Sequence, residues 1–114
     1  MPVQVKRIYD PAAPGDGERI LVDRLWPRGI SKEKADLGEW MKDIAPSADL
    51  RKWYGHKPER WDEFRRRYRE ELESNPLVEP LRERIGKGTV TLLYGARDRE
   101  RNQAVALADY LTRQ

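Results

Sequence analysis

The sequence predicts an α/β fold in which helices flank a small, mostly parallel sheet, with residues 1–114 forming a single domain. Two strand-length segments, residues 20–25 and 89–94, are rich in Ile, Leu and Val, as is typical of interior strands covered on both faces. A long helix-rich passage separates them, and parallel pairing needs such a crossover. These observations predict that the two strands pair in parallel.

Two strands are predicted in the N-terminal part of the chain. The first covers residues 3–9 and ends where Pro11 follows Asp10. A loop rich in Pro and Gly follows it. The second strand covers residues 20–25, because Pro27 has no amide hydrogen and prevents the ladder from continuing.

Serine residues indicate where the next two helices begin. Ser31 and Ser47 can each accept an unpaired amide proton of a first helical turn, which predicts helices through about residue 36 and over residues 48–54. Residues 37–44 fit either a short helix or an irregular packed segment.

A long helix is predicted over residues 58–74, because its apolar side chains recur at helical spacing. Its arginines have carboxylates four residues away, as in Glu63 with Arg67 and Arg66 with Glu70. This pattern indicates a solvated face that neutralises itself, and we do not expect nucleic acid to bind there. A further helix, the strand at residues 89–94 and a last helix from about Glu100 to Leu111 complete the chain.

Composition excludes several classes of site. The chain has 23 Lys and Arg against 20 Asp and Glu, a net charge of +3, so the charge is too balanced for a disordered chain. It has no cysteine, which excludes disulfides and thiolate ligands or nucleophiles. One histidine and scattered carboxylates give no metal-ligand spacing, and no phosphate-loop motif occurs, so we expect neither a metal nor a cofactor. No window has the length of a membrane span, and we expect a cytoplasmic protein with no membrane contact.

Charged and aromatic side chains follow both interior strands where each strand ends. Ligands of parallel α/β sheets bind beyond the carboxyl ends of the strands, and the loops after two paired strands are neighbours. Guanidinium groups and the amides that open a helix both favour anions, so we expect a shared site for an anionic small molecule. The ligand-binding candidates are Arg24, Trp26, Arg28, Tyr94, Arg97 and Asn102.

The catalytic candidates are Asp23, Asp98 and His56. In this interpretation Arg28 and Arg97 hold the anion, Asp23 or Asp98 polarises it or accepts a proton, and His56 is an acid–base partner. Structural roles explain the same residues. Asp23 could pair with a neighbouring arginine to anchor the loops, and His56 could close a helix by donating to its free carbonyls. The four tryptophans are expected in the core rather than on a stacking surface.

Several motifs, in one order along nearly the whole chain, resemble the YeaO-like family of uncharacterised bacterial proteins, a subgroup of domain-of-unknown-function family four-eight-eight. They are Lys6-Arg7-Ile8-Tyr9-Asp10, Leu21-Val22-Asp23-Arg24-Leu25-Trp26-Pro27-Arg28-Gly29, Ala45-Pro46-Ser47, Trp53-Tyr54-Gly55-His56 and Leu92-Leu93-Tyr94. The resemblance implies an α/β fold and no particular reaction.

Distant relatives in the broader family carry cysteines near the last strand and a Cys-His-Arg element at the start of the final helix. Tyr94 stands near the first of these positions in this chain, and Arg101-Asn102-Gln103 stands at the second. YeaO-like chains often have a histidine just before that asparagine, where this chain has Arg101. Thiol chemistry therefore cannot extend to this chain. A role that depends on histidine at this position cannot extend to it either, because position 101 is an arginine.

Three functional hypotheses remain open at this point. The first is a protein that binds, and either transforms or releases unchanged, a phosphate- or carboxylate-bearing small molecule. The second is a nucleic-acid-associated module that uses basic residues, namely Lys6, Arg7, Arg24, Arg28 and the run at residues 65–69. The third is a protein-interaction domain without chemistry, which a large exposed apolar patch would favour. The sequence does not indicate an oligomeric state.

Overall fold

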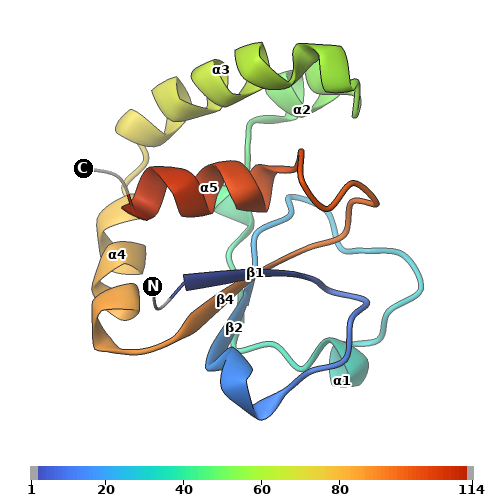
Figure 1. Ribbon diagram of the computed structural model, residues 1–114, viewed down its shortest axis with the longest axis vertical. Helices are drawn as coiled ribbons and strands as arrows, with labels where there is room; N and C mark the ends of the chain where they lie inside the picture. The colour runs from blue at the N-terminus through green and yellow to red at the C-terminus, as the bar shows by residue number, and fades with distance from the viewer. Residues whose placement is uncertain (1–2, 113–114) are drawn as a thin grey trace.

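The computed structural model describes residues 3–112, which form an α/β fold (Figure 1). Its four strands make one sheet, and every neighbouring pair is parallel. The strands are β1 (Val3–Arg7), β2 (Glu18–Leu21), β3 (Glu39–Trp40) and β4 (Val90–Tyr94), in the spatial order β1–β4–β2–β3. The helices are α1 (Lys32–Ala35), α2 (Ala48–Tyr54), α3 (Trp61–Glu73), α4 (Val78–Lys87) and α5 (Gln103–Thr112), with 3-10 turns η1 (Pro14–Asp16), η2 (Lys42–Ile44) and η3 (Pro58–Arg60).

The last strand is the centre of the sheet. All five residues of β4 are buried, and its Leu92 lies opposite Val5 of β1 on one side and Ile20 of β2 on the other. The predicted parallel pairing of the second and last strands is confirmed. Since β4 is covered on both faces, its mostly apolar character follows from its position, and the buried hydroxyl of Thr91 donates to the carbonyl of Asp16 at 2.7 Å.

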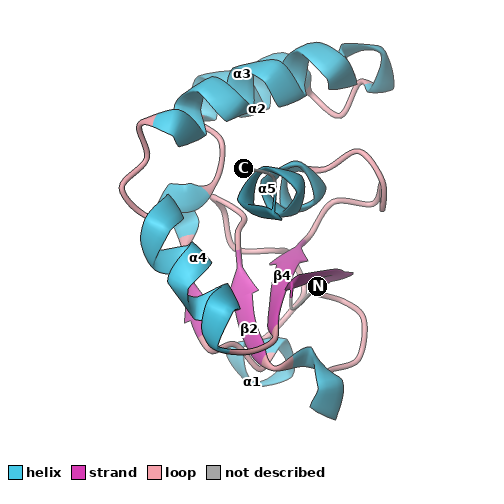
Figure 2. Cartoon of the chain, turned by 60° about the vertical axis from the view of Figure 1, so that its left-hand side comes forward, coloured by secondary structure: helices cyan, strands magenta, loops and turns pink. Residues whose placement is uncertain are grey.

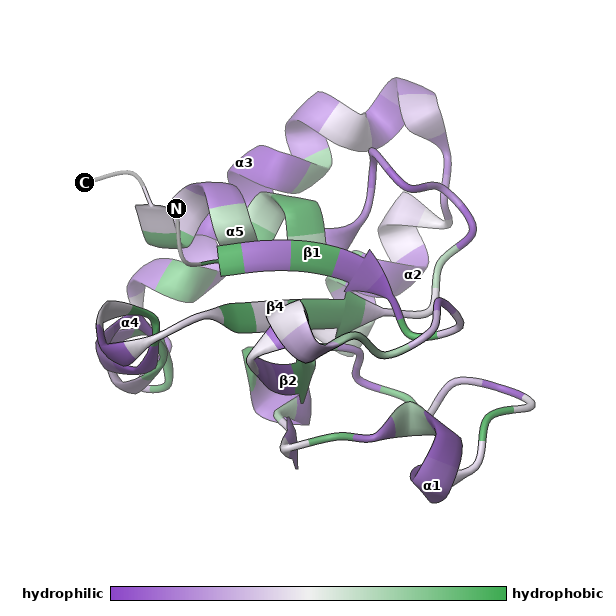
Figure 3. Ribbon diagram, turned by 60° about the horizontal axis from the view of Figure 1, so that its bottom comes forward, coloured by the Kyte–Doolittle hydropathy of each residue, from purple (hydrophilic) through white to green (hydrophobic). Residues whose placement is uncertain are grey.

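The two faces of the sheet are covered differently. Helix α5 lies on β1 and β4, and α3 lies outside α5, while α1 is on the opposite face (Figure 2). The larger core, on the α5 side, includes Ile20 and Leu92; the smaller one includes Leu21, Leu93 and Ala35 of α1. Figure 3 shows the apolar strands between more hydrophilic outer helices. Successive side chains of β2 and β4 therefore point alternately into the two cores.

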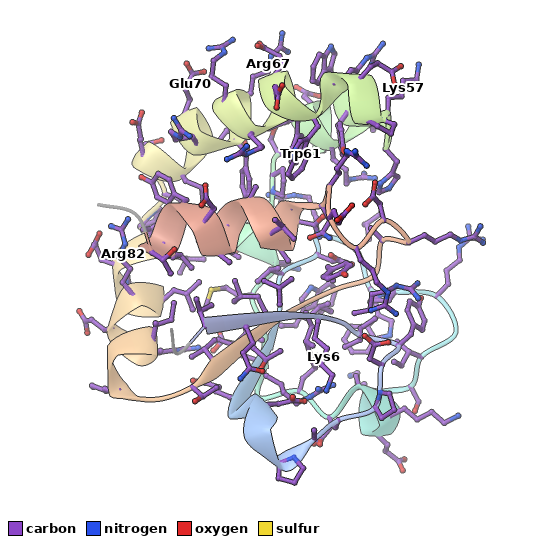
Figure 4. All side chains as sticks on the ribbon, viewed as in Figure 1. Lys6, Lys57, Trp61, Arg67, Glu70 and Arg82 are labelled. Atoms are coloured by element: carbon purple, nitrogen blue, oxygen red, sulfur yellow. The ribbon has the colours of Figure 1, made fainter. Side chains whose placement is uncertain are left out.

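The outer face of α3 carries the predicted charge pairs. Arg67 and Glu70 point away from the body of the molecule in Figure 4, whereas Trp61 points toward it. Glu63 pairs with Arg67 at 2.8 Å, and Arg66 pairs with Glu70 at 3.1 Å. Arg66 and Arg67 are therefore neutralised within the helix.

The structure differs from the predicted elements in several places. The first strand ends at Arg7, and the second runs from Glu18 to Leu21, with the amide of Val22 still donating to the carbonyl of Leu93. The ambiguous segment contains the short edge strand β3, because the amide of Met41 donates to the carbonyl of Leu21. The last helix begins at Gln103 rather than near Glu100. In each place, contacts with distant or capping groups override the local pattern.

Buried ion pairs centre on Asp16, in the turn before β2. Asp16 is 3% exposed and accepts from Arg19 at 2.6 Å and from Lys6 at 3.1 Å. Arg19 also donates to the carbonyls of Ala35 and Asp36. The cluster ties β1, β2 and α1 together.

Candidate functional site: an arginine-lined cavity at the strand ends

An open cavity of about 490 Å³ lies at the carboxyl ends of β1, β2 and β4. The loop before α2, α2 with the turn after it, α3 and the start of α5 also contribute to its lining. Of the predicted site residues, it brings together Asp23, Arg24, Trp26, Arg28, His56 and Arg97. Tyr94, Asp98 and Asn102 do not line it. This is the place where parallel α/β sheets bind ligands.

Asp23 is the one carboxyl group among the described residues that line the cavity. Its Oδ2 accepts the backbone N–H of Gly95 at 2.8 Å, and its Oδ1 accepts the side-chain amide of Gln103. Burial raises the pKa of Asp23 to about 6, although both hydrogen bonds oppose this shift. A Cβ atom on Gly95 would lie 2.9 Å from Oδ2, so the close approach depends on glycine. The carboxyl group is therefore held without a cationic partner.

The structure does not contain the predicted alternative in which Asp23 pairs with an arginine. Within residues 3–112, Asp23 forms no ion pair. Arg24 instead donates to the carbonyls of Pro46 at 2.9 Å and Ala45 at 3.2 Å. Arg24 thus anchors the loop before α2, which is a structural role.

Arg7, the last residue of β1, also binds neutral carbonyl groups. Its Nε donates to the carbonyl of Ala96 at 2.8 Å, and its guanidinium group lies 4.7 Å from the ring centroid of Tyr9. Because carbonyls carry no net charge, Arg7 and Arg24 keep their full positive charge at the cavity.

Three further arginines line the cavity without partners. In the part of the chain that the structure describes, the guanidinium groups of Arg28, Arg51 and Arg97 form no hydrogen bond or ion pair. All three residues are exposed. Five arginines and a single carboxyl group thus line the cavity, so its lining carries an excess of positive charge.

His56 lies at the edge of the cavity, in the turn after α2. Backbone groups close that helix, since the amide of Gly55 donates to the carbonyl of Arg51 at 3.1 Å. Within the described residues the His56 ring forms no hydrogen bond, and its nearest aromatic neighbour is Tyr54, with ring centroids 6.1 Å apart. The His56 ring therefore does not cap α2, and its contact is with the ring of Tyr54.

The three predicted residues outside the cavity have structural roles before α5. Asp98 accepts the backbone N–H groups of Glu100 at 2.9 Å and Arg101 at 3.0 Å, and these hydrogen bonds lower its pKa. Asn102 is buried and accepts the N–H of Val105 at 2.9 Å. Tyr94 is also buried, and this burial raises its pKa. These groups shape the loop that carries Arg97.

Aromatic side chains form the apolar part of the cavity. Trp26 packs edge-to-face on Trp40, with ring centroids 5.3 Å apart, and its indole N–H donates to the carbonyl of Ile30. Tyr54 stacks on Phe64 at 4.4 Å across the cavity lining. The prediction that all four tryptophans lie in the core is wrong for Trp40, whose exposed fraction is 37%.

The lining residues absent from the predicted site include three with long polar side chains: Arg7, Arg51 and Gln103. Arg7 ends a strand of the same sheet, so the strand-end pattern that indicated Arg28 also applied to it. Arg51 lies on α2 and Gln103 opens α5, and no local sequence feature marks either one. Only the packing of these helices brings them to the cavity.

Two further classes of site are absent from the described residues. Residues 3–112 contain no group of three or more His, Asp or Glu side chains arranged to hold a metal ion. None of the helices in this range is both long enough and apolar enough to cross a membrane.

The family model described as "Inactive DUF488-N3 subclade" matches residues 2–114. The chain belongs to this DUF488 subclade. Within it, the chain is similar to the uncharacterized protein YeaO of Escherichia coli (strain K12), with 46% identity over 112 residues, or 97% of each chain. It is also similar to the uncharacterized protein Rv3073c of Mycobacterium tuberculosis, with 47% identity over 109 residues, or 96% of this chain and 92% of the relative.

The same identity and coverage relate the chain to the uncharacterized protein Mb3100c of Mycobacterium bovis. No solved structure matches the chain. The YeaO-like resemblance of the sequence motifs is confirmed by these DUF488 relatives. Two positions depart from the cysteine and histidine pattern described for the broader family. Tyr94 is buried. Arg101 is exposed, and its guanidinium Nη1 lies 3.6 Å from Oδ2 of Asp98.

Proposed function

We propose that this DUF488 protein binds a phosphate- or carboxylate-bearing small molecule in the arginine-lined cavity. One observation carries the proposal. Arg28, Arg51 and Arg97 line a single cavity and have no protein partner among the described residues. Arginine forks suit the oxygens of phosphate and carboxylate groups, and unpaired cations grouped in a concave site favour a bound anion.

The proposed role is binding without turnover. The description of the subclade as inactive supports this choice. Asp23 accepts hydrogen bonds from Gly95 and Gln103, which give this carboxyl group a structural role in joining the loops of the site. The remaining acid–base group, His56, lies in the turn after α2 with no carboxylate to orient it in the described structure.

The nucleic-acid hypothesis has less support. A nucleic-acid surface requires unpaired cations spread along a face. The basic run on α3 is instead paired, with Arg66 and Arg67 both bound to Glu63. Arg28, Arg51 and Arg97, by contrast, are grouped in one cavity, a shape that suits a small ligand.

Phosphate titration followed by calorimetry at constant ionic strength tests the proposal. Arg28→Gln and Arg97→Gln should each weaken phosphate binding at least about fivefold, the scale of one charge-assisted hydrogen bond lost from an exposed site. Arg69→Gln is the matched control, since Arg69 is exposed on α3, outside this cavity, and should change affinity less than about twofold. Equal losses of phosphate affinity in all three variants would mean that binding depends only on the net charge of the protein and not on the cavity.

A further inference from the structure

The cavity has an apolar wall that an anion alone would leave uncovered. A phosphate group occupies a few times the roughly 30 Å³ of a liquid water molecule. The cavity, at about 490 Å³, lies within the size range of small-molecule sites. A ligand that fills it must therefore carry a body beyond its anionic group.

The chemistry of the wall indicates what that body is. Leu25, Pro27 and Phe64 contribute only carbon atoms to the lining beyond their backbone. Trp26 joins them, because its single polar atom already donates to the carbonyl of Ile30 at 2.9 Å. The hydroxyl of Tyr54 likewise donates to the carbonyl of Arg101 at 2.9 Å. The wall thus offers little to a sugar or other polyhydroxylated group and suits a ring or hydrocarbon.

Leu25 is the most informative residue of this wall. It is 60% exposed, more than any other exposed large hydrophobic residue of the described chain. A single exposed leucine is ordinary on a protein surface. This one lies at the cavity, next in the chain to Trp26, whose position is fixed by its edge-to-face contact with Trp40. Leu25 and Trp26 thus supply apolar lining to the same cavity as the unpaired guanidinium groups.

We infer that the ligand is an amphipathic acid, in which a phosphate or carboxylate group is joined directly to an aromatic or other apolar ring. The inference rests on the proposed anion binding and specifies its ligand class. The acid meets Arg28 and Arg97, and the ring lies against Leu25 and Trp26. Burial of the ring adds a hydrophobic contribution to the charge-assisted hydrogen bonds.

Two matched pairs of compounds test the inference by calorimetry at constant ionic strength: phenyl phosphate with inorganic phosphate, and benzoate with acetate. In at least one pair the ring-bearing acid should bind at least about tenfold more tightly, or about 1.4 kcal/mol. The pair that shows the gain identifies the acid group. Benzyl alcohol, which has the ring without the acid, should show no saturable binding at concentrations where the ring-bearing acid saturates.

Variants at Leu25 locate the ring. Leu25→Ser should reduce the gain from the ring at least about threefold and leave inorganic phosphate binding unchanged, whereas Leu25→Met should keep the gain. The high exposure of Leu25 makes both variants compatible with folding. A gain below about twofold in both pairs overturns the inference, as does a gain that Leu25→Ser leaves intact. If phosphate binding still depends on Arg28 and Arg97 in those cases, the proposed function stands. If neither acid of either pair binds, both proposals fail.

Discussion

The carboxyl group of Asp23, just beyond β2, accepts the backbone N–H of Gly95, just beyond β4, at 2.8 Å. The two residues are 72 positions apart in the chain, and the bond exists because their strands pair in parallel. It joins the two loops that carry Arg28 and Arg97. It also explains why a carboxyl group among five guanidinium groups forms no ion pair in the described structure: its oxygens are turned toward Gly95 and Gln103.

Asp23 should make the protein less stable as the pH rises through about 6. Its pKa is raised from 3.8 to about 6 in the folded protein, so its contribution to stability is complete below about pH 4 and is lost as the pH rises through about 6. Urea unfolding between about pH 4.5 and 8 should show this decline in the wild type and a flatter profile in Asp23→Asn.

The Asp23→Asn variant should fold, because the Gln103 amide can turn over and present its oxygen to the new amide group. Carboxyl groups with lowered pKa, such as Asp10 and Asp98, do not confuse the comparison. Their stabilising contributions are lost only as the pH falls below about 4. Parallel stability profiles for the two proteins would contradict the assignment.

Arg24 and Arg28, both at the cavity, should differ sharply in their effect on stability. Arg24→Ala removes two hydrogen bonds to the buried carbonyls of Ala45 and Pro46 and should reduce the free energy of unfolding by about 2 kcal/mol. Arg28→Ala should change it by less than about 0.5 kcal/mol, since its exposed guanidinium group has no partner in the described chain. Chemical denaturation measures both. A large loss in Arg28→Ala would indicate a structural role and weaken the proposed function.

The buried cluster around Asp16 should dominate the electrostatic contribution to folding. Asp16→Ala leaves Arg19, whose side chain is 5% exposed, without its carboxylate partner, and should cost about 3–5 kcal/mol. Glu70→Ala is the surface counterpart, because the side chains of Glu70 and Arg66 are 62% and 57% exposed. It should cost less than about 1 kcal/mol. Comparable losses in urea denaturation would show that burial does not set the strength of these pairs.

Gly17 should tolerate no side chain, whereas Gly15, in the same loop, should. Gly17 has a φ of 64°, and a Cβ atom there would lie 2.2 Å from the carbonyl oxygen of Thr89. Gly17→Ala should therefore lower the free energy of unfolding by more than about 2 kcal/mol. Nothing lies within 4 Å of a Cβ atom on Gly15, so Gly15→Ala should stay within about 0.5 kcal/mol of the wild type. Thermal unfolding of the two variants separates these outcomes.

The sequence by itself determined the features that depend on neighbouring residues. Ser31 and Ser47 cap helices through amides three residues ahead, at 3.1 Å and 3.2 Å, and these contacts form wherever the local chain turns into a helix. The apolar run of β4 predicted a central, doubly covered strand, because burial on both faces requires an unbroken pattern. From two parallel strand ends, the location of the cavity followed.

Only the tertiary structure decided which groups meet at that cavity and how each is bonded. The edge strand β3 exists because Leu21 offers its carbonyl to Met41, a choice that no pattern within residues 37–44 contains. Arg51 and Gln103 reach the cavity because α2 and α5 pack there. The partners of Asp23 depend likewise on strand pairing across the sheet. The local periodicity of a sequence indicates which face of a helix or strand is buried. It does not indicate which distant donor will form a hydrogen bond with a buried carboxyl group.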